Sequence, residues 1–228
     1  MAGRILGIGV GIGDPEDLTL KAIRLVKESD CLILPRQDLD RCRAYQIALR
    51  SVPEIADKER LALEFEMTGD QKVRDANHRK IYVAAKELVL AGKTVAFLTI
   101  GDPAVYSTYS YIAALAQEDG IETEAASGIS SITACANRLG ITLCDGDEQL
   151  HVIPDASDLE SALSLPGTKI LMKCGRDLPA LKEKLRGRNV SVYAVSDCGM
   201  NNERCFYSLE ELPDDGSYML TVIIKELQ

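Results

Sequence analysis

The stretch Thr94–Tyr111, TVAFLTIGDPAVYSTYSY, predicts a buried strand, a polar turn and a helix. Residues 95–98 form a continuous apolar run, which is typical of a buried strand when turn residues end it. Gly101-Asp102-Pro103 supplies that turn, because glycine frees the backbone, aspartate can bond the amides that follow, and proline fixes φ. The helix is predicted over residues 104–117. Ligands of α/β folds bind at the carboxyl ends of strands, so this turn is either a binding site or an ordinary connection.

The chain begins with a second segment of the same kind. Residues 4–10 (RILGIGV) predict a strand, Gly13-Asp14-Pro15 predicts a turn, and residues 18–28 predict a helix. Two such turns can face one another when both strands lie in one parallel sheet. The glycine-rich start does not follow the G-x-G-x-x-G fingerprint, because Ile12 or Asp14 stands where the third glycine would fall. This mismatch disfavours a nucleotide-dependent dehydrogenase.

The remaining elements follow from periodicity and turn residues. Strands are predicted over residues 31–35, 61–65, 121–125, 150–153, 168–173, 191–195 and 218–225, and helices over residues 70–91, 129–139 and 178–185, with a partly helical segment over 36–50. After Asp119-Gly120 the strands become shorter and the turn signals denser. We therefore predict an N-terminal α/β domain of residues 1–118 and a C-terminal α/β domain of residues 119–228, with residues 121–125 crossing into the second.

Composition and charge disfavour several classes of protein. Of the 228 residues, 46% are hydrophobic and 27% are charged, as in an ordinary globular protein. The formal net charge of −9 argues against nucleic-acid binding, and an anionic ligand would need a local basic patch. No apolar run approaches the roughly 20 residues that span a bilayer, and the start of the chain does not resemble a signal peptide. A cytoplasmic protein without a membrane partner is expected.

Cysteine and histidine usage points away from metal chemistry. The seven cysteines form no C-x-x-C pair, so neither a zinc site nor a disulfide framework is predicted, and most thiols are expected to be buried. His78 is predicted to lie on the surface of the long helix, and His151 to be structural. Because these two histidines lie far apart in sequence, we predict no metal ligands and no ordinary catalytic triad.

Four segments together resemble the tetrapyrrole methylase family, over essentially the whole chain and in order. They are GIGVGIGDPEDLTLKAI (7–23), TIGDPAVYSTYSYI (99–112), ASGISSITACANRLGI (126–141) and ILMKCGRDL (170–178). Members of this family use S-adenosylmethionine to methylate the uroporphyrinogen-to-corrin series. The run Tyr106-Ser107-Thr108-Tyr109, with residues 139–154, resembles the branch that methylates carbon 20 of precorrin-2 or of cobalt-factor II.

The resemblance implies two α/β domains, each on its own sheet, with the cofactor in the cleft between them, and a homodimer. It also implies which positions bind S-adenosylmethionine. These are Ile12, Gly13, Ile100, Gly101, Asp102, Val105, Tyr106, Ser130, Ser131, Met172, Cys198, Gly199 and Thr221.

The chain departs from the family pattern at three positions. Ile12 replaces a proline of the first loop, Ser127-Gly128 replaces Pro-Gly, and Cys198 replaces a glycine. Cofactor contacts in the family are largely made through backbone groups, so these side-chain changes are compatible with cofactor binding. The changes make the assignments of Ile12 and Cys198 less direct than the others.

The expected chemistry needs few catalytic side chains. A sulfonium methyl would pass in line to a ring carbon of an electron-rich tetrapyrrole, and alignment alone can contribute up to ~7–11 kcal/mol. The substrate's carboxylates call for Arg or Lys, because guanidinium binds carboxylate in two places. Arg36 is the first candidate and Lys173 and Arg176 follow, with Arg204 a weaker one; the alternative for each is a solvated surface charge.

Two further side chains have alternative roles. Tyr106 is the candidate catalytic residue, because it follows the central turn and could orient the ring or take up a proton; otherwise it packs in the core. Asp102 is predicted to cap the turn, and it could also attract the cationic sulfonium.

Two other functions compete with methylation at carbon 20. The first is methylation of another position of the corrin or porphyrin series. The run 106–109 is the feature that distinguishes methylation at carbon 20 from this alternative. The second is a nucleotide-binding α/β module without catalysis. No residue decides whether the tetrapyrrole substrate contains cobalt.

Overall fold

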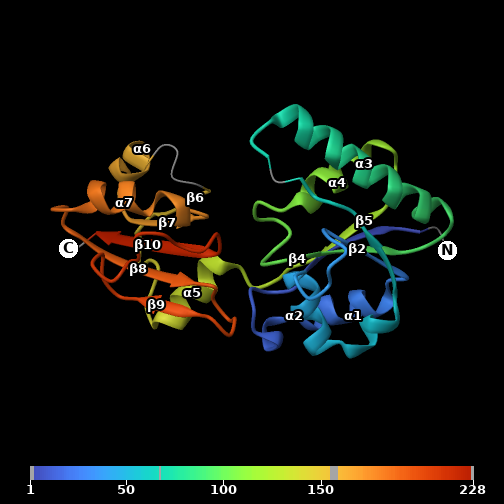
Figure 1. Ribbon diagram of the computed structural model, residues 1–228, viewed down its shortest axis with the longest axis horizontal. Coiled ribbons are helices and arrows are strands. Elements are labelled where there is room, and N and C mark those ends of the chain that lie inside the picture. The colour runs from blue at the N-terminus through green and yellow to red at the C-terminus, as the bar shows by residue number, and fades with distance from the viewer. Residues whose placement is uncertain (1–2, 67, 155–158, 227–228) are drawn as a thin grey trace. The chain divides into compact units, whose positions relative to one another are not determined.

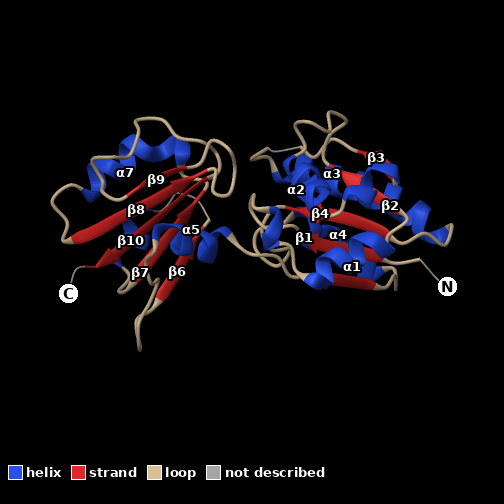
Figure 2. Ribbon diagram, turned by 90° about the horizontal axis from the view of Figure 1, so that it is seen from below, coloured by secondary structure: helices blue, strands red, loops and turns tan. Residues whose placement is uncertain are grey.

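A computed structural model of the chain describes residues 3–66, 68–154 and 159–226, and it contains two compact units (Figure 1). The first unit is Met1–Ser130 and the second is Ser131–Gln228. Each unit is built on its own five-stranded sheet with helices packed against it (Figure 2). The prediction of two α/β domains, each on its own sheet, is therefore confirmed.

The division between the units falls later than residues 118 and 119, where the sequence placed it. Strand β5 (Thr123–Ala126) does not cross into the second unit. It pairs in parallel with β1 (Ile5–Gly9) and forms an edge of the first sheet. The turn at Asp119-Gly120 ends helix α4 (Thr108–Glu118), which is a crossover helix within the first unit rather than a link between domains.

The first sheet is entirely parallel, with the strand order β3-β2-β4-β1-β5. Its other strands are β2 (Cys31–Leu34), β3 (Glu59–Ala62) and β4 (Val95–Thr99). Helices α1 (Leu20–Glu28) and α2 (Arg43–Ser51) cover one face, and α3 (Gln71–Leu90) and α4 cover the other (Figure 1). Strands β1, β2 and β4 are therefore buried on both faces, which explains their continuous apolar sequences.

Local capping decides where the helices begin. Asp70 caps α3 by accepting hydrogen bonds from the amides of Lys72 and Val73. Helix α4 begins at Thr108 rather than at residue 104, because Ser107 is its N-cap and accepts from the Tyr109 amide. The residues between Pro103 and Ser107 thus remain in the turn at the end of β4.

The second sheet is mixed, with the order β6-β7-β10-β8-β9. Its strands are β6 (Leu150–Ile153), β7 (Thr168–Met172), β8 (Val190–Ser196), β9 (Arg204–Phe206) and β10 (Leu220–Glu226), and its helices are α5 (Ser131–Leu139), α6 (Leu159–Ser164) and α7 (Leu178–Leu185). Short 3-10 helices occur at Pro15–Asp17, Pro53–Asp57 and Gly175–Asp177. Strand β10 is antiparallel to both β7 and β8, so those two strands end beside the start of β10. The sequence did not predict α6 and β9, which are among the shortest elements.

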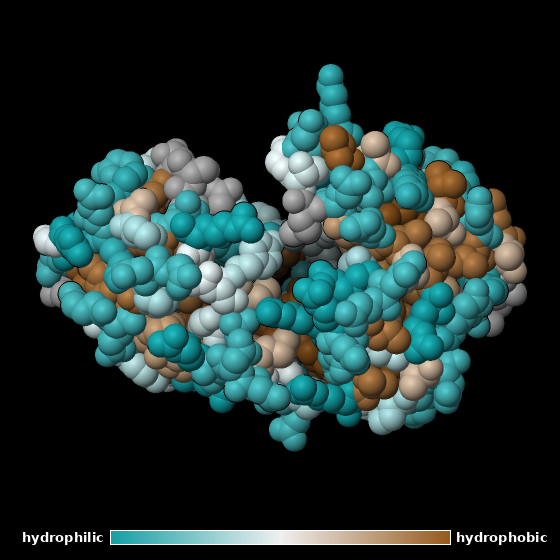
Figure 3. Space-filling view, in the orientation of Figure 1, coloured by the Kyte–Doolittle hydropathy of each residue, from teal (hydrophilic) through white to brown (hydrophobic). Residues whose placement is uncertain are grey.

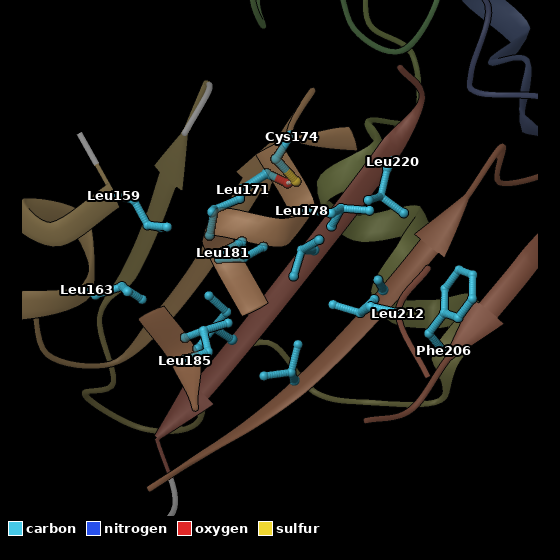
Figure 4. Packing of buried hydrophobic residues seen from close by; sticks show 14 residues of the cluster. Leu159, Leu163, Leu171, Cys174, Leu178, Leu181, Leu185, Phe206, Leu212 and Leu220 are labelled. Atoms are coloured by element: carbon cyan, nitrogen blue, oxygen red, sulfur yellow. Dashed lines mark hydrogen bonds between the residues drawn. The ribbon is translucent and has the colours of Figure 1, made fainter. Parts of the chain in front are cut away.

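The core of the second unit lies between the sheet and helices α6 and α7 (Figure 4). It contains Leu159, Leu163, Leu171, Cys174, Leu178, Leu181, Leu185, Val192, Ala194, Phe206, Leu212, Leu220, Val222 and Ile224. Lys169 is also buried, and its ammonium pairs with the carboxylate of Glu226, which is half-exposed. This pair lies at the start of β7 and the end of β10, away from the edge where β7 and β8 end.

Surface and thiol properties follow from the same packing. Cys31, Cys42, Cys135, Cys174 and Cys198 are buried and Cys205 is half-buried, so the prediction of mostly buried thiols is confirmed. Exposed apolar side chains gather over the part of the first unit where α3 lies (Figure 3), and the large exposed hydrophobic residues of this helix are Val73, Val83 and Leu90. Within the described ranges, the helices are too short or too polar to cross a membrane.

Candidate functional site

Three loops meet at the carboxyl ends of β1, β4 and β5 in the first unit. The amide of Gly101 donates a hydrogen bond of 2.7 Å to the carbonyl of Gly11, so the two predicted Gly-Asp-Pro turns are neighbours. A side chain on Gly9 would place its Cβ 2.5 Å from the amide nitrogen of Gly128 and 2.6 Å from the carbonyl oxygen of Gly101. The three backbones therefore approach so closely that only glycine fits at Gly9 and Gly128. We call Gly9, Gly101 and Gly128 the glycine junction.

Asp102 holds this junction together. One carboxylate oxygen accepts from the amide of Ala104 at 2.8 Å and so caps its own turn, as predicted. The other oxygen accepts from the amide of Gly128 at 3.1 Å and ties the β4 turn to the β5 turn. The equivalent Asp14 accepts from the amide of Glu16 at 2.9 Å, which is the first kind of bond. Asp102 is therefore a brace between loops as well as a cap.

The two tyrosines after the central turn have opposite environments. Tyr106 is 51% exposed and has a φ of 47°, a left-handed conformation that is rare outside glycine. Core packing is thus excluded for Tyr106. Tyr109 is buried against Gly7, where its ring occupies the space of a side chain, and its hydroxyl donates to the carbonyl of Glu124. Burial raises the pKa of Tyr109 to about 12, so this hydroxyl remains protonated. Of the run 106–109, Tyr109 belongs to the core.

The eight expected cofactor residues of the first unit lie on the loops that follow its strands. Ile12 and Gly13 follow the bridge between Gly11 and Gly101, and Ser130 lies beside the same turn. The residues concerned are Ile12, Gly13, Ile100, Gly101, Asp102, Val105, Tyr106 and Ser130. Apart from its chain neighbours, a Cβ added to Gly101 would have one atom of this unit within reach, the Cα of Ser130 at 4.0 Å. The face of the turn is therefore open to a ligand that contacts the main chain, and the residues fit an adenosyl group held through backbone contacts.

The second unit gathers its expected residues at the edge where β7 and β8 end. Met172 and Thr221 are register partners on β7 and β10, and Cys198 and Gly199 follow β8. Ser131 begins α5, which packs against β8 and β10. Thr221 is only 4% exposed, so its side chain belongs mainly to the interior of the unit.

A thiol pair lies beneath this edge. The Cys135 thiol donates a hydrogen bond to the Cys198 sulfur, which lowers the pKa of Cys198 and, together with burial, raises that of Cys135. Arg138 adds a positive charge that also lowers the pKa of Cys198. The side chain of Cys198 therefore points to neighbours within the unit, which leaves its backbone as the part that can serve a ligand.

The candidate substrate residues lie in both units. Arg36 is exposed just beyond the end of β2 in the first unit. Lys173 and Arg176 follow β7 in the second unit, where the Lys173 ammonium lies 6.0 Å from the centre of the Tyr218 ring. Lys173 has a φ of 57°, a second left-handed residue beside an expected cofactor position. Arg204 lies over the ring of Phe206 on β9, which supports a packing role.

Sequence reasoning was wrong about His78 and missed several residues of these loops. His78 is 8% exposed and stacks on Tyr111, with ring centres 4.5 Å apart, so it is not a surface residue. Asp197, Ser217 and Glu203 hydrogen-bond at the turn after β8, and no sequence pattern indicated them beyond their residue types. Among the described residues, no group of three or more His, Cys, Asp or Glu side chains could hold a metal ion.

Comparison with known proteins identifies the family. The sequence model of the Tetrapyrrole (Corrin/Porphyrin) Methylases matches residues 4–213, which is most of the chain. The chain belongs to the tetrapyrrole methylase family. It is 38% identical to a probable cobalt-precorrin-2 C(20)-methyltransferase from Methanocaldococcus jannaschii, over 75% of this chain and 72% of the relative. It is 29% identical to a precorrin-2 C(20)-methyltransferase from a Sinorhizobium species, over 97% of this chain and 95% of the relative.

Solved structures of similar proteins have the same fold as this tetrapyrrole methylase. A uroporphyrin-III C-methyl transferase from Thermus thermophilus, complexed with S-adenyl homocysteine, superposes with a TM-score of 0.72. The two chains are 22% identical, and the match covers 98% of each. This identity is low enough that the likeness supports the fold alone.

Proposed function

We propose that this protein transfers a methyl group from S-adenosylmethionine to carbon 20 of precorrin-2, either metal-free or as the cobalt form, in cobalamin biosynthesis. The observation that carries the proposal is the sequence similarity to two relatives of this specificity, along nearly the full chain in one case. The glycine junction supports it, because the open face of Gly101 suits a cofactor held by main-chain contacts. When bound, S-adenosylmethionine supplies an electrophilic methyl group on its sulfonium.

The chain's own residues would bind and align the reactants. Asp102 would keep the β4 and β5 turns in register, so that the backbone of residues 100–102 presents a fixed surface. The expected residues of the second unit, Ser131, Met172, Cys198, Gly199 and Thr221, complete the proposed cofactor set. Arg36, Lys173 and Arg176 are proposed to bind substrate carboxylates. Alignment of this kind needs no strong acid or base.

Incubation with S-adenosylmethionine and each substrate form tests the proposal. We expect mass spectrometry to detect one added methyl group and NMR to place it at carbon 20, with either precorrin-2 or cobalt-factor II as the better substrate. Methylation at any other carbon would overturn the assigned position. If calorimetry on the folded protein detected no S-adenosylmethionine binding, every methyltransferase proposal would fail.

Tyr106 is proposed as the catalytic or orienting side chain of this reaction. It is half-exposed next to the cofactor turn, and its strained backbone is of the kind found at functional sites. Tyr106→Phe should lower kcat about tenfold or more if the hydroxyl accepts the proton that the methylated carbon releases while it passes its own proton to water. Tyr111→Phe is the matched control, because Tyr111 is equally exposed on α4 but stacks on His78. Equal turnover of both variants would remove the acid–base role.

We further propose that the enzyme is a cytoplasmic homodimer. The resemblance to the family implies the dimer, and seven free cysteines suit a reducing compartment. Light scattering of the purified protein should give twice the mass of the 24.9 kDa chain. A mass of one chain at working concentration would contradict the dimer.

A further inference from the structure

Asp197 is a buried aspartate in a left-handed backbone conformation. It follows β8 directly, has a φ of 49° and is 5% exposed. Residues other than glycine adopt this conformation at a cost, and it persists only where the surrounding structure holds it. Together with Tyr106 and Lys173, Asp197 is one of three non-glycine residues with positive φ in the described chain, and all three lie beside expected cofactor positions.

The side chain and main chain of Asp197 connect two loops. One carboxylate oxygen accepts from the hydroxyl of Ser217 at 3.1 Å, and the other accepts from Ser196 at 3.0 Å. The amide of Asp197 donates to the carbonyl of Met219, and its own carbonyl accepts from the amide of Met200. Asp197 therefore fixes the turn after β8 against the segment that enters β10.

The turn held in this way contains Cys198 and Gly199. Its other side is held by Glu203, which accepts from the Gly199 amide at 2.6 Å and pairs with Arg138 at 3.0 Å. Because the amide of Gly199 already bonds Glu203, the turn contributes to a ligand mainly through its shape and its carbonyl groups. That shape depends on residues that brace it rather than on the residues of the turn alone.

We propose that Asp197 is a positioning residue that holds the Cys198–Gly199 turn in the form that binds S-adenosylmethionine. This inference rests on the proposed function. Asp197 acts through geometry rather than as a charge toward the cofactor, because its carboxylate is buried and both oxygens accept hydroxyl hydrogen bonds.

Three substitutions separate the carboxylate from the backbone conformation. Asp197→Asn keeps an acceptor and tolerates positive φ, so it should preserve the turn. Asp197→Gly keeps the conformation but removes the link to Ser217. Asp197→Ala removes both. Glu226→Gln is the matched control, because it leaves Lys169 buried without its ion-pair partner at the other end of the same sheet.

Calorimetric titration with S-adenosylhomocysteine measures the effect without any substrate. We expect the dissociation constant to rise about tenfold in Asp197→Ala, somewhat less in Asp197→Gly, and by less than about twofold in Asp197→Asn. The KM for S-adenosylmethionine should rise similarly, with a smaller change in kcat. Glu226→Gln should lower the melting temperature while the dissociation constant stays at the wild-type value.

Three results would overturn the positioning role. The first is wild-type affinity in Asp197→Ala, and the second is wild-type affinity in Asp197→Gly. The third is a loss of affinity in Glu226→Gln equal to that in Asp197→Ala, because affinity would then only follow the stability of the unit. A wild-type protein that does not bind S-adenosylhomocysteine would overturn the proposed function and this inference with it. Binding by wild type together with any of the first three results overturns this inference alone.

Discussion

His78 illustrates how a single buried titratable residue makes stability depend on pH. Its ring stacks on Tyr111, and its Nδ1 atom has no hydrogen-bond partner within the described chain. Burial lowers the pKa of His78 from its ordinary value of 6.5; the nearby Asp75 opposes this shift and Arg74 adds to it. The native state therefore favours the neutral form of the His78 imidazole over the protonated form.

The direction of this pKa shift determines how the stability of the protein changes with pH. Below pH 6.5 the unfolded chain binds a proton at His78, whereas the native chain does not. The contribution of the neutral ring to the unfolding free energy is therefore full above that pH and is lost as the pH falls toward the native pKa. His78→Phe keeps the stack on Tyr111 and should flatten the fall in unfolding free energy between about pH 7.5 and about pH 5.5. Denaturant unfolding measures this fall, with His151→Gln as the control. A fall as steep in His78→Phe as in wild type would contradict the prediction.

At the scale of the elements, the glycine junction explains why strands β1, β4 and β5 can end so close together. A Cβ on Gly128 would lie 2.2 Å from the carbonyl oxygen of Gly101, which is backbone and cannot rotate away. The loops would have to separate, and the bond from Asp102 to the Gly128 amide would be strained. The close packing of the loops and the shape of the proposed cofactor surface therefore both depend on the backbone atoms of the glycine junction.

Gly128→Ala should therefore destabilise the first unit by about 2–3 kcal/mol, as overpacking of a tight contact does. It should also weaken S-adenosylhomocysteine binding, because the β4 turn would shift. Gly69→Ala is the control: a Cβ there has no atom within 4 Å, and the change should stay within about 0.5 kcal/mol. Chemical denaturation measures both variants. If Gly128→Ala were as stable as Gly69→Ala, the loops would have room for a Cβ at Gly128 and the close packing of the junction would be contradicted.

At the scale of the whole molecule, ligand binding should stabilise the fold by mass action. At a hundred times its dissociation constant, S-adenosylhomocysteine should add about 2.7 kcal/mol to the stability of the part that binds it. For a chain of this size that corresponds to a rise of about 5–10 °C in melting temperature. Differential scanning calorimetry measures the rise, and ATP is the control ligand. A rise with ATP but none with S-adenosylhomocysteine would favour the nucleotide-binding module instead.

Much of the fold could be predicted from short segments. The apolar run at 95–98 became β4, and the Gly-Asp-Pro turns at Gly13 and Gly101 became neighbours because both strands are parallel in one sheet. Strand β6 and helix α7 have the predicted bounds. The family could also be recognised, because its glycine-rich loops keep their order along the chain. These features depend on neighbours in sequence, so the sequence alone contains them.

The sequence by itself determined the two-sheet α/β fold, the family and the turns that are the candidate cofactor positions. Only the tertiary structure decided where the first unit ends, since that depends on β5 pairing with β1. It also decided that Tyr109 is core while Tyr106 is exposed, that His78 is buried, and that Asp197 braces a turn through Ser217. The physical reason is that burial and bracing are set by contacts between segments far apart in sequence, which no local pattern specifies.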